Sequence, residues 1–259
     1  MTTADRGLLR LSWPPCASAL ASPYGMAYRE GGLLCGCQGH PRLTVDHCLT
    51  CSAHGYVTHR HNNLRDELAA AGVEVGYAGV AAGLGAMGTV REVPIPVPGA
   101  ARGLKLDVEL CTYREGGDGA EVMCGVDVAV VHATPRTLAD GPSSFSVGHA
   151  ARGRASAKHR KYSAYVGAGR IFRPAVWETY GRAGVDVLKL VDDISKSAWV
   201  RDEWGGRAGL TPKQATAQYR ARLMQRCSFL LMQANVQYCL LQRARLALVF
   251  HRAAAAQAP

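Results

Sequence analysis

Alternating apolar and polar positions mark the middle of the chain as its most strand-like part. Residues 103–113 (GLKLDVELCTY) alternate with the period of a β-strand. Residues 122–133 (VMCGVDVAVVHA) follow a glycine-rich turn and are almost continuously apolar, which predicts that the second strand of a hairpin is central and buried. A third β segment is expected at 170–180, and the alternate prolines of 93–97 allow at best an edge strand.

Helical patterns flank these strands at residues 62–71, 149–166, 184–199 and 211–251. Asn62 is the expected N-cap of the first helix and Gly72 its end, with a short strand following at 73–80. The last helix begins at Thr211-Pro212, a cap followed by a first-turn proline. This order of elements predicts an α/β domain with a small module in front and a long helix behind.

Four regions are expected along the chain. Residues 1–34 form a lead segment that is either poorly ordered or the remnant of an upstream region. Residues 35–61 hold a cluster of cysteines and histidines, residues 62–200 form the α/β domain, and residues 201–259 form a helical tail.

Composition and charge narrow the class of protein. The 259 residues are 48% hydrophobic and 19% charged, which excludes a disordered chain. Residues 1–150 carry 11 Lys and Arg against 14 Asp and Glu, a net charge of −3, whereas residues 151–259 carry 19 against 6, a net charge of +13. A basic half indicates a polyanionic partner, with nucleic acid first, and a solvated basic surface is the alternative.

The cysteines and the chain start point to a reducing compartment. Nine cysteines, an odd number, do not suit a secreted disulfide framework. The start of the chain has no apolar signal segment, and the most apolar run, 227–242, contains too many amides to span a bilayer. We therefore expect an intracellular protein with no membrane partner.

The cysteines and histidines of residues 35–61 predict a metal site. Cys35, Cys37, His47 and Cys51 can form a Cys₃His tetrahedron, a donor set that suits structural Zn²⁺. Competing ligands in the same stretch are Cys48, His54, His59 and His61. The alternative is that these residues are free thiols and surface histidines.

Two aspartates in the predicted hairpin suggest a second metal site. Asp107 and Asp127 are flanked by apolar residues, and a buried carboxylate is costly unless something compensates its charge. The two could share Mg²⁺, with a lysine as positive partner, in the manner of restriction-type nucleases; strand-end or surface aspartates are the alternative. The basic helix expected after the hairpin holds lysines that could take this role, among them Lys158 and Lys161. The surrounding basic residues suit phosphate contacts: Arg152, Arg154, Arg160 and Lys161.

Several short motifs, in order, resemble the tail of reverse-transcriptase polyproteins from non-LTR mobile elements. LTVDHCLTC followed by HRHNNLRDEL is similar to that family's Cys/His knuckle and Arg-His-Asn helix. Two Asp-Val strands and a Lys-x-x-x-Tyr helix come next, and the final helix is also similar. The matching residues are Cys35, Cys37, His47 and Cys51; Arg60, His61, Asn62 and Asp66; Asp107 and Asp127; and Lys158 with Tyr162.

The resemblance implies a restriction-endonuclease-like domain of the PD-(D/E)xK type over residues 62–200, preceded by a zinc knuckle. It implies that Asp107 and Asp127 bind Mg²⁺, that Lys158 is the catalytic lysine, and that His61, Asn62 and Asp66 support the site. DNA contacts are expected from Arg60 and from the basic residues around Lys158.

The implied activity is nicking of target DNA so that its 3′ end can prime reverse transcription. Partners would be DNA or the element's RNA, with the last helix available to a second copy or to the missing polymerase domain, and a nuclear location follows from such a role. Two other readings stay open: an inactive nucleic-acid-binding remnant, and a structural zinc protein that binds another protein through the last helix.

Overall fold

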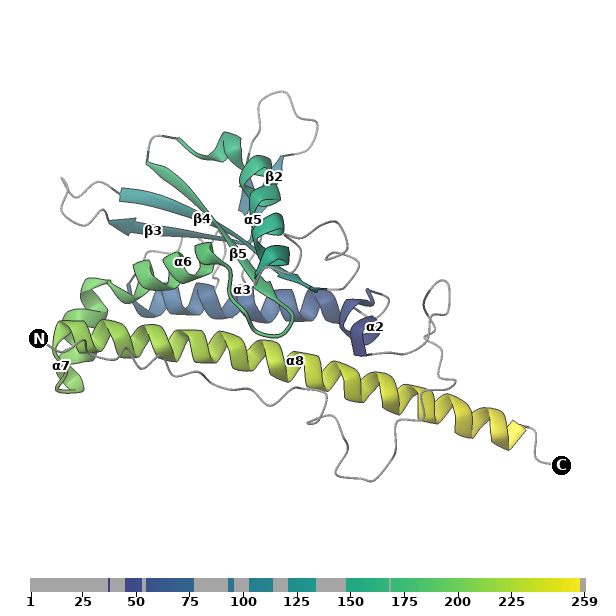
Figure 1. Cartoon of the computed structure of the whole chain (residues 1–259). Helices are drawn as coiled ribbons and strands as arrows, with labels where there is room; N and C mark the ends of the chain where they lie inside the picture. Colours follow the sequence, from purple (N-terminus) through teal and green to yellow (C-terminus); the bar gives the residue numbers. More distant parts are fainter. Residues whose placement is uncertain are drawn as a thin grey trace, which may run out of the picture.

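The computed structural model describes most of the chain from the cysteine cluster onward. Within the described residues the fold is mixed α/β, with a three-stranded sheet, helices on both of its faces and a long C-terminal helix (Figure 1). The predicted lead segment lies outside the described residues, which are 37, 45–52, 55–76, 93–95, 103–113, 121–133, 148–167 and 169–256.

The central strand of the sheet is β4 (Glu121–Val131), as its apolar run predicts. It pairs antiparallel with β3 (Val108–Tyr113) and parallel with β5 (Arg170–Glu178). A parallel pair needs a crossover connection, and α5 (His149–Lys161) lies between β4 and β5 in the chain. Apart from this sheet, β1 (Val93–Ile95), the expected edge strand, pairs with β2 (Leu104–Leu106).

The two faces of the sheet pack against different helices. One face is covered by α3 (Tyr56–Glu74) and α6 (Val185–Ser195), and α8 (Pro212–Ala256) packs against these two helices. Trp177, which is fully buried, belongs to this main core. Its neighbour Val176 points to the opposite face and packs against Ala151 of α5. Because side chains alternate along a strand, Asp127 also faces α5.

The amphipathic pattern of α6 explains its packing. Its buried side chains recur at helical spacing and turn toward the sheet, while Lys189 and Leu188 between them are exposed. The buried set is Val187, Leu190, Val191 and Ile194. The predictions for α5, α6 and β5 are thus confirmed apart from shifts at their ends.

The long helix α8 is part of the core. Its first half buries Tyr219, Leu223 and Leu231 in the cluster that covers the sheet. Figure 1 shows α8 running along α3 before it extends past the rest of the molecule. A separate helical tail over 201–259 is therefore not observed. The outer side of α8 nevertheless exposes apolar side chains, among them Phe229 at 67%.

Two predicted elements differ in their limits. The helix expected from Asn62 begins at Tyr56, after Gly55 with a φ of 72°, so Asn62 is an interior residue and not a cap. The same helix continues to Glu74, which replaces the start of the strand expected at 73–80 and crosses the predicted boundary between residues 61 and 62. The strand predicted over 103–113 is broken at Asp107 into β2 and β3.

Candidate functional site

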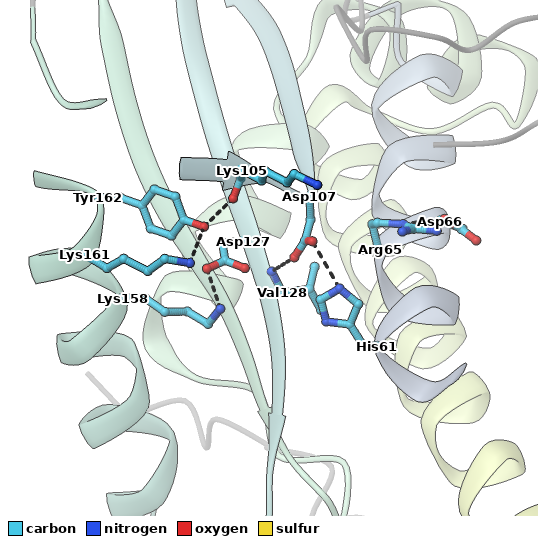
Figure 2. Close-up of polar contacts among 10 residues, drawn as sticks. All are labelled: His61, Arg65, Asp66, Lys105, Asp107, Asp127, Val128, Lys158, Lys161 and Tyr162. Carbon is cyan, nitrogen blue, oxygen red and sulfur yellow. Dashed lines mark hydrogen bonds and ion pairs between the residues drawn. The ribbon is translucent and has the colours of Figure 1, made fainter. Parts of the chain in front are cut away.

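Asp127 and Lys158 form a buried ion pair between β4 and α5. In the strand register Asp127 is opposite Pro174 of β5. Its carboxylate Oδ2 lies 2.5 Å from the Nζ of Lys158, and neither side chain is more than 10% exposed (Figure 2). Each charge alone would carry a desolvation cost of several kcal/mol, so the pair depends on this close placement.

Asp107 lies beside this pair because the chain breaks between β2 and β3. Its backbone N–H donates to the carbonyl of Val126 at 3.0 Å, and its carboxylate accepts a hydrogen bond from the Val128 N–H at 2.6 Å. Val126 and Val128 precede and follow Asp127 in β4, so these two hydrogen bonds place Asp107 next to Asp127. From the other side, Nε2 of His61 in α3 lies 3.1 Å from Oδ1 of Asp107.

Burial and mutual contact give the three charged groups different proton affinities. Burial alone would raise the pKa of Asp107, but the hydrogen bonds and charge of His61, Val128 and Asp127 hold that pKa below its ordinary value. Burial raises the pKa of Asp127, and the neighbouring Asp107 raises it further, against the lowering by Lys158. As the pH falls, Asp127 is therefore the first of the two carboxyl groups to take up a proton. Burial also lowers the pKa of Lys158 despite its pairing with Asp127.

This donor set fits a hard divalent cation. Two carboxylates in contact with each other repel when both are ionised, and a proton or a cation between them relieves that repulsion. Carboxylate oxygens are the ligands that Mg²⁺ prefers. The structure thus brings together Asp107, Asp127 and Lys158, the residues that the sequence singles out, and adds the ring of His61.

The other predicted support residues do not all reach this site. Asn62 is a half-buried residue of α3. Asp66 pairs instead with the neighbouring Arg65, at 2.9 Å, and Figure 2 shows its carboxylate turned away from Asp107. His61 and Asp66 are five residues apart, which turns their side chains by about 140° from each other at about 100° per residue, so the two face different sides of α3. The structure therefore does not bring Asp66, an expected support residue, to the carboxylate site (Figure 2).

Arg60 is also placed differently from its prediction as a DNA contact. Its side chain is 2% exposed and donates to Oδ1 of Asn235 at 2.8 Å and to the carbonyl of Leu49 at 2.5 Å. Asn235 in turn donates to the carbonyl of Thr179 at 2.7 Å. A buried guanidinium that joins α2 (Val45–Thr50), α3 and α8 is not available to a phosphate. Sequence reasoning missed Asn235, which is 175 residues from its partner.

The basic residues of α5 agree better with their prediction. Lys158 is buried in the site, whereas its basic neighbours are exposed: Arg152, Arg154, Arg160 and Lys161. Cations in the last turn of α5 are also favoured by the negative end of the helix dipole. These exposed cations are distributed around α5, and of the four only Arg154 and Lys161 lie within about 60° of Lys158 at about 100° per residue.

Cys37, His47 and Cys51 form a second cluster near the start of α3. One donor atom from each lies within 4.8 Å of the others, so these residues could hold a metal ion. The Sγ of Cys37 is 3.5 Å from Nε2 of His47. Burial lowers the pKa of His47, which favours the neutral imidazole that binds metals.

The remaining predicted ligands of this cluster are Cys35, Cys48, His54, His59 and His61. Cys35, the fourth expected ligand, and His54 lie outside the described residues. Cys48 is buried in an apolar cluster with α8 residues. His61 contacts the carboxylate site, and His59 is an exposed residue of α3. His61 thus lies at the carboxylate site and not at the Cys/His cluster.

Comparison with known proteins adds no assignment to this geometry. The sequence matches no protein-family model and no curated protein. Among the described helices, none has the length and apolar character needed to cross a membrane.

Proposed function

We propose that this chain is a Mg²⁺-dependent DNA endonuclease of restriction-like type from a mobile element, and that it hydrolyses one phosphodiester bond to leave a nick. The observation that carries the proposal is the buried contact of Asp107, Asp127 and Lys158. These residues come from a strand break, a central strand and a helix, and a purely structural core would be more stable with apolar groups there.

The chain's own residues would divide the chemistry among them. Asp107 and Asp127 would hold the cation, with Asp107 fixed by the Val128 N–H and by His61. Bound Mg²⁺ would polarise the scissile phosphate and lower the pKa of an attacking water. Lys158, whose pKa is lowered by burial, can orient that water or take its proton. Attack on phosphorus breaks the bond to the leaving 3′ oxygen and gives 5′-phosphate and 3′-hydroxyl ends.

Substrate binding would use the exposed basic residues of α5. Arg154 and Lys161 are turned toward the same side of the helix as Lys158, so a DNA backbone bound by them would pass the carboxylates, with Arg152 and Arg160 available to flanking phosphates. The Cys/His cluster would bind Zn²⁺ through Cys37, His47 and Cys51, with Cys35 as the fourth ligand. Thiolate and imidazole donors suit this ion, and a segment as short as α2 gains its stability from such a centre.

The decisive experiment compares plasmid nicking with DNA binding. Wild-type protein should convert supercoiled plasmid to open circles with Mg²⁺ and not in its absence, and Asp127→Asn should abolish nicking while DNA is still bound. Asp66→Asn is the matched control, because it makes the same change on a carboxylate paired with Arg65. Binding without nicking in the wild-type protein would instead favour the inactive nucleic-acid-binding remnant.

A further inference from the structure

Lys161, at the end of α5, is held by the buried tyrosine that follows it. Its Nζ donates a hydrogen bond to the Tyr162 hydroxyl at 3.0 Å, and that hydroxyl donates to the backbone carbonyl of Lys105. Lys158 and Lys161 are three residues apart and share one side of the helix. Figure 2 shows both side chains extending from α5 toward the strand of Asp127.

Tyr162 is a rigid support for this contact. It is fully buried, and its ring stacks on Phe172 with 4.5 Å between centroids. Because its hydroxyl proton points to the Lys105 carbonyl, the oxygen presents a lone pair to Lys161. An exposed lysine is usually free to adopt many rotamers, and this one is restrained at its charged end.

The charge of Lys161 differs from that of Lys158. Asp127 neutralises Lys158, whereas no carboxylate in the described ranges forms an ion pair with Lys161. An ammonium has three N–H donors, so the bond to Tyr162 leaves two for a ligand. A restrained cation beside a carboxylate site has the chemistry to bind an anionic oxygen.

We propose that Lys161 positions the substrate by binding a non-bridging oxygen of the DNA backbone at the entrance to the Asp107–Asp127–Lys158 site, and that Tyr162 positions Lys161. This inference rests on the proposed endonuclease function. It gives Lys161 a role of its own beside the arginines of α5, whose proposed role is general contact with the phosphates of the backbone.

A double-mutant cycle on DNA binding tests the inference. Affinity for a labelled duplex is measured by fluorescence anisotropy in EDTA over a series of salt concentrations. Lys161→Gln should lower the affinity by about tenfold, as expected for loss of a charged hydrogen bond, and should reduce the salt slope by about 0.9. Tyr162→Phe, which keeps the ring, should lower the affinity by about threefold, since the Lys161 charge stays but its restraint is lost. The double variant should bind no more weakly than Lys161→Gln alone.

Arg160→Gln is the matched control, since it removes one exposed charge from the adjacent position. The fold-loss of DNA affinity caused by Arg160→Gln should multiply with the fold-loss caused by Tyr162→Phe. Multiplying losses for Lys161→Gln and Tyr162→Phe would overturn the positioning role of Tyr162. An unchanged affinity and slope for Lys161→Gln would overturn the proposal as a whole, whatever the stability of the tyrosine variant. Because binding in EDTA needs no cleavage, a coupled cycle in a protein that never nicks would contradict only the endonuclease function.

Discussion

The carboxylate site and the Cys/His cluster both contact the start of α3, but they are built in opposite ways. Arg60 and His61 are adjacent, yet Arg60 holds α2 and α8 near the Cys/His cluster whereas His61 contacts Asp107. The described members of the Cys/His cluster lie within residues 37–51, and the carboxylate site collects its members from residues 61–158. A local cluster can depend on a metal for its order, while the carboxylates depend on the fold that surrounds them.

The largest expected effect is loss of the proposed zinc from one ligand substitution. Wild-type protein purified under reducing conditions should contain about one zinc per chain, and Cys51→Ser should contain almost none, because apparent binding free energies of structural zinc are about 10 kcal/mol or more and depend on every ligand. Metal analysis by mass spectrometry measures both. Cys124→Ser, a buried cysteine of β4, should keep the metal. Wild-type protein that contains no zinc would contradict the proposed zinc site in the Cys/His cluster.

Breaking the buried ion pair should have the next largest effect. Lys158→Met should lower the free energy of unfolding by about 3 kcal/mol, the low end for a broken buried pair, because Asp127 can take up a proton once its partner is gone. Urea denaturation in EDTA measures the loss. Combining Lys158→Met with Asp127→Asn should restore part of it. Lys189→Met is the matched control on a lysine that is 56% exposed, and an equal loss there would contradict the argument.

Two adjacent substitutions can show that the start of α3 contacts both clusters. Arg60→Met should destabilise the protein by about 2 kcal/mol, since it leaves Asn235 and the Leu49 carbonyl without this donor. It should also speed zinc loss to a chelator, because α2 loses its attachment to α3. His61→Ala should leave zinc release unchanged. If both variants released zinc at the same rate, Arg60 and His61 would not act on separate clusters.

Part of each of the two sites could be predicted from the sequence. The density of cysteines and histidines is enough to find a local cluster, and the almost continuous apolar run of β4 is enough to place Asp127 in a buried strand. The joining of Asp107, Asp127 and Lys158 came from a resemblance in the order of short motifs, because no periodicity relates a strand break to a helix some fifty residues later.

The directions of individual side chains on α3 could not be predicted from the sequence. Arg60 and Asp66 belong to the same motif region as His61, but a helix rotates by about 100° per residue, and the packing of α8 decides which side is buried. The early start of α3 was missed because YVTHRH has no apolar stripe. Its burial comes from Arg60 and from the stacking of Tyr56 on Tyr238, a residue of distant α8.

The smallest expected effect separates the two carboxylates by pH. The folded pKa of Asp107 is lowered from 3.8, so its stabilisation is present above that value and is lost as the pH falls through the folded pKa. The folded pKa of Asp127 is raised, so its protonated form stabilises the metal-free protein at low pH, and that stabilisation is lost as the pH rises through the folded pKa.

The two opposite dependences of folding stability on pH should partly cancel in the wild-type protein. In EDTA, Asp127→Asn should therefore steepen the loss of stability toward acid, and Asp107→Asn should flatten it, between roughly pH 3 and pH 7. Urea midpoints measured across that range report the slopes. Identical changes in the two variants would mean that Asp107 and Asp127 titrate alike, and the opposite pKa shifts inferred for the two carboxyl groups would have to be abandoned.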